Sequence, residues 1–167
     1  MALSQAKLEA MFAGPPVATE AAAIDFMAQQ FVAFFLDATV VAVPALPAPL
    51  AGPEAQLRAG LVGMSVAGQA AVRMQAGITA FWTAAMLVAP TIWVTVPVIL
   101  PASGVIPPGL GGLAASLSGV FASNTASKAD LATASSALGA AIYAAQLGAT
   151  VTLSPPPPGG TPLVPVL

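Results

Sequence analysis

The sequence contains no cysteine and no histidine among its 167 residues. It can therefore form no disulfide and no thiolate nucleophile, and it lacks the commonest general base and metal ligand. Catalytic sites of the serine–histidine–aspartate or cysteine–histidine kind are excluded. The six acidic residues are dispersed and form no metal-binding motif, and no phosphate-binding P-loop is present. We accordingly expect a protein that is not an enzyme and that binds no cofactor and no metal ion.

Charge is also scarce, at 6% of residues, whereas a typical soluble domain has about 25%. Because a free soluble protein usually keeps a charged, mixed surface, most of this surface must be small and polar, or must be covered. A lipid bilayer and a large protein assembly both suit such a chain. The four basic residues, Lys7, Arg58, Arg73 and Lys128, are scattered. Phosphate binding needs clustered basic residues, so we expect no direct contact with nucleic acid.

The longest uncharged run lies between Arg73 and Lys128 and contains both tryptophans. Its central part, residues 77–100, begins with Ile78–Val88, whose alanine, methionine and leucine content predicts a helix. Pro90 should end that helix, since proline disfavours helical backbone at the residue before it. The β-branched and aromatic stretch that follows, Thr91–Val96, predicts a short strand.

The same order of helix, threonine, strand and proline recurs near residues 31–44, 78–97 and 142–155. The alternative is coincidence in a chain rich in alanine, valine and proline. The three predicted strands are Thr39–Val43, Thr91–Val96 and Thr150–Leu153. The helical parts do not align residue by residue, so the pattern indicates a recurring supersecondary unit rather than a duplication.

Other helices are predicted from apolar periodicity, caps and breakers. They cover Leu3–Phe12 with Ser4 as a possible cap, Thr19–Leu36 capped by Thr19, a helix starting at Pro53, Leu113–Ala122 broken by Ser123–Thr125, and a last helix capped by Ser127 and ending at Gly148. Four glycines interrupt the third helix and cost about 1 kcal/mol each relative to alanine. They indicate close approach of another backbone, and they are Gly60, Gly63, Gly68 and Gly77.

We therefore predict a mainly helical α+β fold, in which four or five alanine-rich helices pack on a small sheet of about three short strands. Residues 1–153 would form one domain, and residues 154–167 an extended proline-rich C-terminal arm. The predicted core residues of the strands are Val41, Val43, Trp93 and Val151. Those of the helices are Phe31, Phe34, Phe35, Met64, Trp82, Met86, Leu138 and Ile142.

The C-terminal segment, with four successive prolines and an apolar end, should lie along a surface of its own chain or of a neighbour. The predicted interface residues are the two tryptophans and apolar residues of this segment. They are Trp82, Trp93, Pro155, Pro156, Pro157, Pro158, Leu163, Val164, Val166 and Leu167.

The hypothesis that these observations favour is a structural subunit of a large assembly, such as the capsid, tail or contractile injection machine of a virion or virion-like particle. Its partners would be other protein subunits, identical or different, bound through extensive apolar interfaces. The start of the chain lacks the pattern of a secretory signal, so we expect a particle assembled in the cytoplasm.

Two alternatives remain open from the sequence. The first is an integral membrane protein with a span near residues 76–100 and a possible return near 105–122, because about 20 apolar residues suffice to cross a bilayer. The prolines of the segment and the absence of flanking basic clusters count against it. The second alternative is a small soluble binding module.

Overall fold

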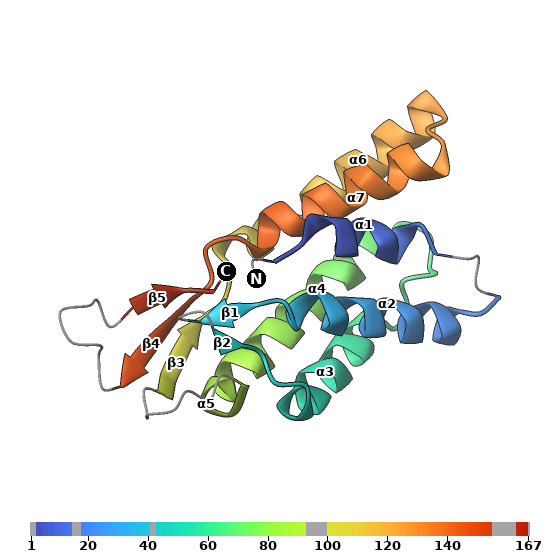
Figure 1. Ribbon diagram of the computed structural model, residues 1–167. Helices are drawn as coiled ribbons and strands as arrows, with labels where there is room; N and C mark the ends of the chain where they lie inside the picture. The colour runs from blue at the N-terminus through green and yellow to red at the C-terminus, as the bar shows by residue number, and fades with distance from the viewer. Residues whose placement is uncertain (1–2, 15–17, 41–42, 93–99, 155–162, 167) are drawn as a thin grey trace.

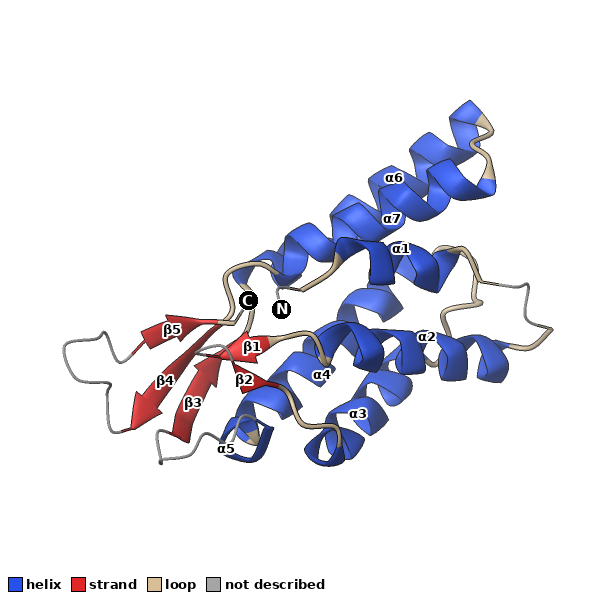
Figure 2. Ribbon diagram, viewed as in Figure 1, coloured by secondary structure: helices blue, strands red, loops and turns tan. Residues whose placement is uncertain are grey.

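The computed structural model of the chain describes residues 3–14, 18–40, 43–92, 100–154 and 163–166, and the statements below concern these residues. Helices make up the body, and the strands gather at one end of it (Figure 2). The helices are α1 Gln5–Phe12, α2 Glu20–Phe35, α3 Ala51–Leu61, α4 Ala70–Leu87, α5 Ala89–Ile92, α6 Leu113–Ser127 and α7 Leu131–Gln146, with two 3-10 turns, η1 Ala48–Leu50 and η2 Pro108–Gly112.

The core lies where α2 and α4 face each other. Phe31 and Phe35 on α2 meet Phe81 and Trp82 on α4 edge to face, with ring centroids 4.9 to 5.0 Å apart. All four side chains are fully or almost fully buried. Edge-to-face aromatic pairs contribute about 0.5–1.5 kcal/mol each beyond the area that they bury. This cluster therefore fixes α2 against α4.

Helices α3 and α4 approach each other through glycines. A Cβ atom placed on Gly60 would lie 2.4 Å from the Cα of Gly77, and one on Gly77 would lie 2.9 Å from the carbonyl oxygen of Leu57. The predicted close approach is confirmed at these two glycines. Gly63 and Gly68 instead have positive φ angles of 88° and 77° in the turn between the two helices, a conformation that glycine adopts without steric cost.

Helices α6 and α7 form an antiparallel hairpin that projects beyond the rest of the body (Figure 1). Lys128 closes α6 in the left-handed conformation, and Asp130 caps α7 by accepting a 2.8 Å hydrogen bond from the backbone N–H of Thr133. The start of α6 lies on α4, where the side-chain oxygen of Gln75 accepts from the N–H of Ala114 at 2.7 Å. At its base the hairpin is therefore fixed to α4.

The strands form two small antiparallel sheets. One is a hairpin of β1 Thr39–Val40 and β2 Val43–Pro44, and the other has the order β3–β4–β5. In the second sheet β4 Thr150–Ser154 is the central strand, flanked by β3 Leu100–Val105 and β5 Leu163–Pro165. The pairing of β3 with β4 shifts its register between Pro101 and Ser103.

The predicted fold class is wrong in its architecture. The chain is mostly helical, its helices pack on one another, and the three predicted strands do not form a common sheet. Thr39, Val40 and Val43 of the predicted strand Thr39–Val43 lie in a separate hairpin, and Thr91–Ile92 is helical. Of the three predicted strands, Thr150–Leu153 alone lies in the three-stranded sheet.

The helical start of Thr91–Val96 has a local cause. The backbone N–H and the side-chain hydroxyl of Thr91 both donate to the carbonyl of Val88, each at 2.8 Å. Threonine thereby closes a helical turn instead of extending the chain. Pro90 stands near the start of α5, where its missing N–H costs nothing. Residues 93–99 lie outside the described residues.

Helix boundaries differ from prediction at three other places. Helix α6 continues through Ser123–Thr125 to Ser127, so Ser127 ends one helix and Asp130, rather than Ser127, caps the next. Helix α3 begins at Ala51, two residues before Pro53. The cap of α2 is confirmed, since the hydroxyl of Thr19 accepts from the N–H of Ala22 at 3.2 Å, whereas the Ser4 side chain makes no cap bond.

The predicted core is largely confirmed in the helices. Seven of the eight predicted side chains are buried, namely Phe31, Phe34, Phe35, Trp82, Met86, Leu138 and Ile142, while Met64 is only partly buried against the core. Val41 and Trp93 lie outside the described residues. Val43 and Val151 lie in β2 and β4.

The proposed membrane span, 76–100, holds the end of α4, all of α5 and the first residue of β3.

Candidate interaction surface

Charged side chains in this protein connect its helices to one another. Lys7 on α1 forms an ion pair of 2.8 Å with Asp37, which follows α2. Arg58 on α3 binds Glu54 on the same helix at 2.6 Å and Asp25 on α2. Glu54 and then Asp25 hold the pKa of the Arg58 guanidinium above its ordinary value. The two ion-pair groups therefore join α1 and α3 to opposite parts of α2.

Three further carboxylates accept hydrogen bonds within the chain. Glu20 accepts from the backbone N–H groups of Gly63 at 2.8 Å and Ser65 at 3.2 Å. Glu9 on α1 accepts from the Ser136 hydroxyl on α7, and Asp130 caps that helix. Eight of the ten charged residues thus have partners inside the chain, namely Lys7, Glu9, Glu20, Asp25, Asp37, Glu54, Arg58 and Asp130.

The Glu20 contact predicts a dependence of stability on pH. Hydrogen bonds from the Ser65 and Gly63 N–H groups hold the pKa of the Glu20 carboxyl below its ordinary value. A lowered folded-state pKa stabilises the fold above the unfolded pKa of about 4.3, and this contribution disappears as the pH falls through the folded-state value. In a Glu20→Gln variant we expect the melting temperature to fall less steeply between about pH 5 and pH 3.

Thermal unfolding followed by circular dichroism across this pH range tests the expectation. A matched control is Glu9→Gln, which leaves the contact between Glu20 and the α3–α4 turn in place. Identical pH profiles for the wild type and Glu20→Gln would show that the turn does not depend on the ionised carboxylate.

The outer face of α4 forms an uncharged groove of about 640 Å³. Its nine lining residues are one from α3 and eight from α4, at intervals of three and one along the helix: Gln56, Val72, Gln75, Ala76, Thr79, Ala80, Thr83, Ala84 and Leu87. This spacing places them on a single helical face. Val72 and Leu87, at its two ends, are 52% and 80% exposed. The opposite face of the same helix carries the buried Phe81 and Trp82.

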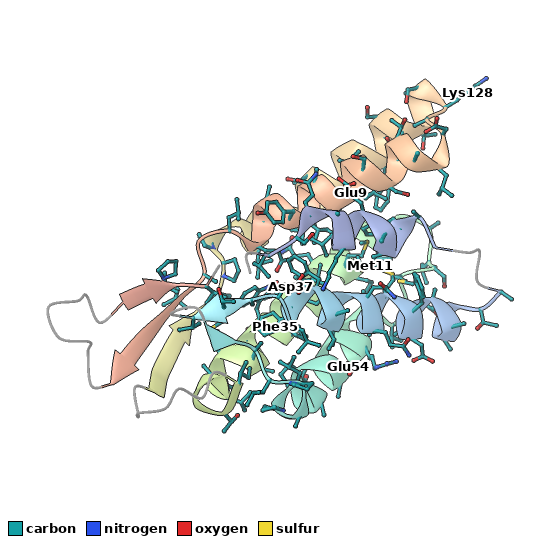
Figure 3. The ribbon with its side chains drawn as sticks, viewed as in Figure 1. Glu9, Met11, Phe35, Asp37, Glu54 and Lys128 are labelled. Carbon is teal, nitrogen blue, oxygen red and sulfur yellow. The ribbon has the colours of Figure 1, made fainter. Side chains whose placement is uncertain are left out.

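The α6–α7 hairpin provides a second uncharged surface. Between Leu113 and Gln146 the charged residues are Lys128 and Asp130, and both lie at the turn that joins the helices. Figure 3 places Lys128 at the far tip. The exposed residues of α6 are small along much of its length, for example Ala115, Ser118, Gly119, Ala122 and Ser123. Arg73 and Lys128 are the two charged residues that are not among the eight with partners named above. Long stretches of the surface therefore carry no charge.

The sequence-predicted interface residues are not gathered by the fold into one surface. Trp82 was predicted both as a core residue and as an interface residue. It is fully buried, so it belongs to the core and offers no surface to a partner. Leu163 and Val164 lie in β5 and pair with β4 of the same chain. Val166 is also buried, and its N–H donates to Ala149. Trp93, the four prolines Pro155, Pro156, Pro157 and Pro158, and Leu167 lie outside the described residues.

Sequence reasoning missed the α4 groove, although a signal for it was present. Once Trp82 and Met86 are assigned to the core, the opposite side of the same helix carries alanine and threonine at helical spacing, with Val72 and Leu87 at the ends. The tryptophans were predicted as interface residues instead, but Trp82 is large enough to be needed in the core.

The described residues bring together no group of three acidic side chains that could hold a metal ion. The carboxylates of Asp25 and Glu54 both bind the guanidinium of Arg58. Comparison with known proteins gave no match to any protein-family model, curated protein or solved structure.

Proposed function

We propose that this chain is a non-enzymatic structural subunit of a large protein assembly, of the kind that builds a virion or virion-like particle. Its partners would be other protein subunits, and it would act by burying uncharged surface against them. The observation that supports the proposal most strongly is the use of charge: eight of ten charged residues bind within the chain, and the α4 face and the hairpin carry almost none. A protein that stays free in solution usually distributes charge over its whole surface.

The alternatives receive less support from the described structure. Among the helices described here, none is both long enough and apolar enough to cross a bilayer. A small binding module would need a recessed site with convergent polar groups. The α4 groove is open and lined mainly by alanine, threonine and aliphatic side chains, which suits contact with another protein surface.

Fractionation of the native source tests the proposal. We expect the chain to sediment with a particle that resists mild detergent and to keep a fixed stoichiometry with the other particle proteins. Release from a membrane pellet by detergent, but not by carbonate, would favour the membrane alternative. Recovery as a soluble monomer at native concentration would contradict both.

A further inference from the structure

We propose that the tip of the α6–α7 hairpin, marked by Lys128 and Leu131, binds a protein subunit of a different kind at a site where a carboxylate lies beside an apolar hollow. This contact rests on the proposed function and specifies one neighbour of the subunit. The hairpin extends away from the body of the protein, so its tip is placed to enter a recess of another molecule (Figure 1). Backbone conformation, charge and exposure at the tip each support the proposal.

The backbone of Lys128 adopts a conformation that lysine disfavours. Its φ and ψ angles are 51° and 45°, in the left-handed region where a Cβ atom crowds the following carbonyl oxygen. The other described residues with positive φ are glycines, and one of them, Gly148 with a φ of 85°, follows the end of α7. Glycine is the usual residue at such a helix end. Because glycine would be more stable at position 128, the lysine indicates a use for its side chain outside the fold.

The ammonium group of Lys128 is available to a partner. Figure 3 shows its side chain at the end of the hairpin, pointing away from the body. Lys7 and Arg58 bind carboxylates of the chain, whereas the side chain of Lys128 has no hydrogen bond or ion pair with the residues that the structure describes. Asp130, the nearest charge along the sequence, uses a carboxylate oxygen to accept from the N–H of Thr133. The tip therefore carries a free positive charge.

Leu131 adds an apolar group to the same tip. Its side chain is 62% exposed, and in the fully described stretch from Leu113 to Gln146 no other large apolar side chain is exposed. It is the first residue of α7, three positions after Lys128. The rest of the hairpin exposes mainly small side chains, so its larger binding groups are gathered at the end. Burial of the leucine would supply affinity, and the charge would supply selectivity.

The complementary carboxylate is expected on a different protein. All six carboxylates of this chain already bind donor groups of their own chain, namely Glu9, Glu20, Asp25, Asp37, Glu54 and Asp130. The phosphates of nucleic acid bind clustered cations, and the hairpin contains no second lysine or arginine. One carboxylate beside an apolar hollow matches one ammonium group beside one leucine.

Zero-length cross-linking of the native particle tests the contact. A carbodiimide joins an amine to a carboxylate only where the two groups touch, and the chain has two lysines, Lys7 and Lys128. Lys7 is the internal control, because its 2.8 Å ion pair with Asp37 should give a link within the chain. We expect peptide mass spectrometry to show Lys128 linked to a carboxylate of a different particle protein.

Two results of this experiment would overturn the proposal. One is formation of the Lys7 link without any link from Lys128. The other is a link from Lys128 to Asp130 or to another carboxylate of this chain, which would make a second copy the partner or leave the tip without one.

Substitution of Lys128 separates a role in binding from a role in the fold. Lys128→Gly should favour the folded state about fivefold in urea unfolding, because it removes the steric cost of the positive φ angle. Expressed together with the wild type in the native source, it should nevertheless be about threefold to fivefold depleted in the particle. Lys128→Arg keeps both the charge and the backbone cost, so it should be incorporated like the wild type. Equal incorporation of Lys128→Gly and the wild type would show that the charge makes no contact.

Leu131→Ala tests the apolar part of the tip. Because Leu131 is largely exposed, the variant should fold normally by circular dichroism, yet its incorporation should fall about tenfold. The matched control is Leu147→Ala at the base of the hairpin, where the leucine is 51% exposed and should not be needed. Equal losses in the two variants would contradict a specific role of the tip.

These measurements also distinguish the contact from the proposed function. If the wild type enters its particle and neither tip variant is impaired, the contact at the tip is wrong and the structural function stands. If the wild type is recovered from the native source as a soluble monomer, the proposed function fails and the contact fails with it.

Discussion

Replacement of Gly60 by alanine should lower the free energy of unfolding by about 2 kcal/mol or more. The added methyl group would lie 2.4 Å from the Cα of Gly77 and 2.6 Å from its nitrogen. Both obstacles are backbone atoms, so neither can rotate away, and α3 must move from α4. Alanine stabilises an isolated helix by about 1 kcal/mol relative to glycine, so a net loss would mean that the steric term exceeds this gain.

Urea unfolding of Gly60→Ala measures the effect, and Gly119→Ala is the matched control. Gly119 also lies within a helix, but a Cβ atom there meets nothing within 4 Å. The control should therefore gain about 1 kcal/mol from helix propensity alone. Equal changes in the two variants would contradict the close contact between α3 and α4.

The role of Gly60 could be predicted from the sequence because glycine is costly in a helix. A residue that costs stability locally indicates a gain elsewhere, and at Gly60 and Gly77 this gain is the approach of two backbones. The same argument applied to Gly63 and Gly68 identified glycines that matter but misjudged the reason. Their requirement is a positive φ angle, and no pattern in the sequence distinguished a turn there from a continuing helix.

The two strands that prediction missed both contain proline. Pro101 lies in β3, which was not predicted as a strand, and Pro165 lies in β5, which was assigned to the proline-rich arm. Proline removes a donor from a sheet, so it excludes a central strand but not an edge strand. Both segments are edges of their sheet, with β4 between them. Whether a strand will be central or at an edge depends on tertiary pairing, which local composition does not encode.

The helical core followed more directly from the sequence, because large apolar residues at helical spacing need burial. The α4 groove could not be predicted from the sequence in the same way. Its residues are small or neutral, and each of them taken alone resembles ordinary helix surface. The buried side chains of α4, among them Met74, Phe81 and Trp82, show which side of the helix remains uncovered. One of the contacts on the buried side of α4 is polar.

The indole N–H of Trp82 donates to the side-chain oxygen of Gln146, the last residue of α7, and both side chains are fully buried. The amide nitrogen of Gln146 has no partner among the described residues. Gln146→Leu should cost about 1–3 kcal/mol by leaving the indole N–H unpaired. Trp82→Phe should cost about 2–4 kcal/mol, because it leaves the amide oxygen without a donor and removes volume from the aromatic cluster.

The double variant distinguishes a specific contact from general packing. If the hydrogen bond holds α7 to α4, Trp82→Phe with Gln146→Leu should cost about 1 kcal/mol less than the sum of the single changes. Trp82→Phe combined with Gly119→Ala, by contrast, should be additive. Additivity in both pairs would show that the contact contributes nothing of its own.

A coupled pair would also explain how α4 keeps its groove uncovered. Each residue turns a helix by about 100°, so a small rotation of α4 would bury Val72 or Leu87 and expose part of the core. A buried hydrogen bond from one fixed position, on the side opposite the groove, penalises such a rotation because it would leave two buried polar groups unpaired.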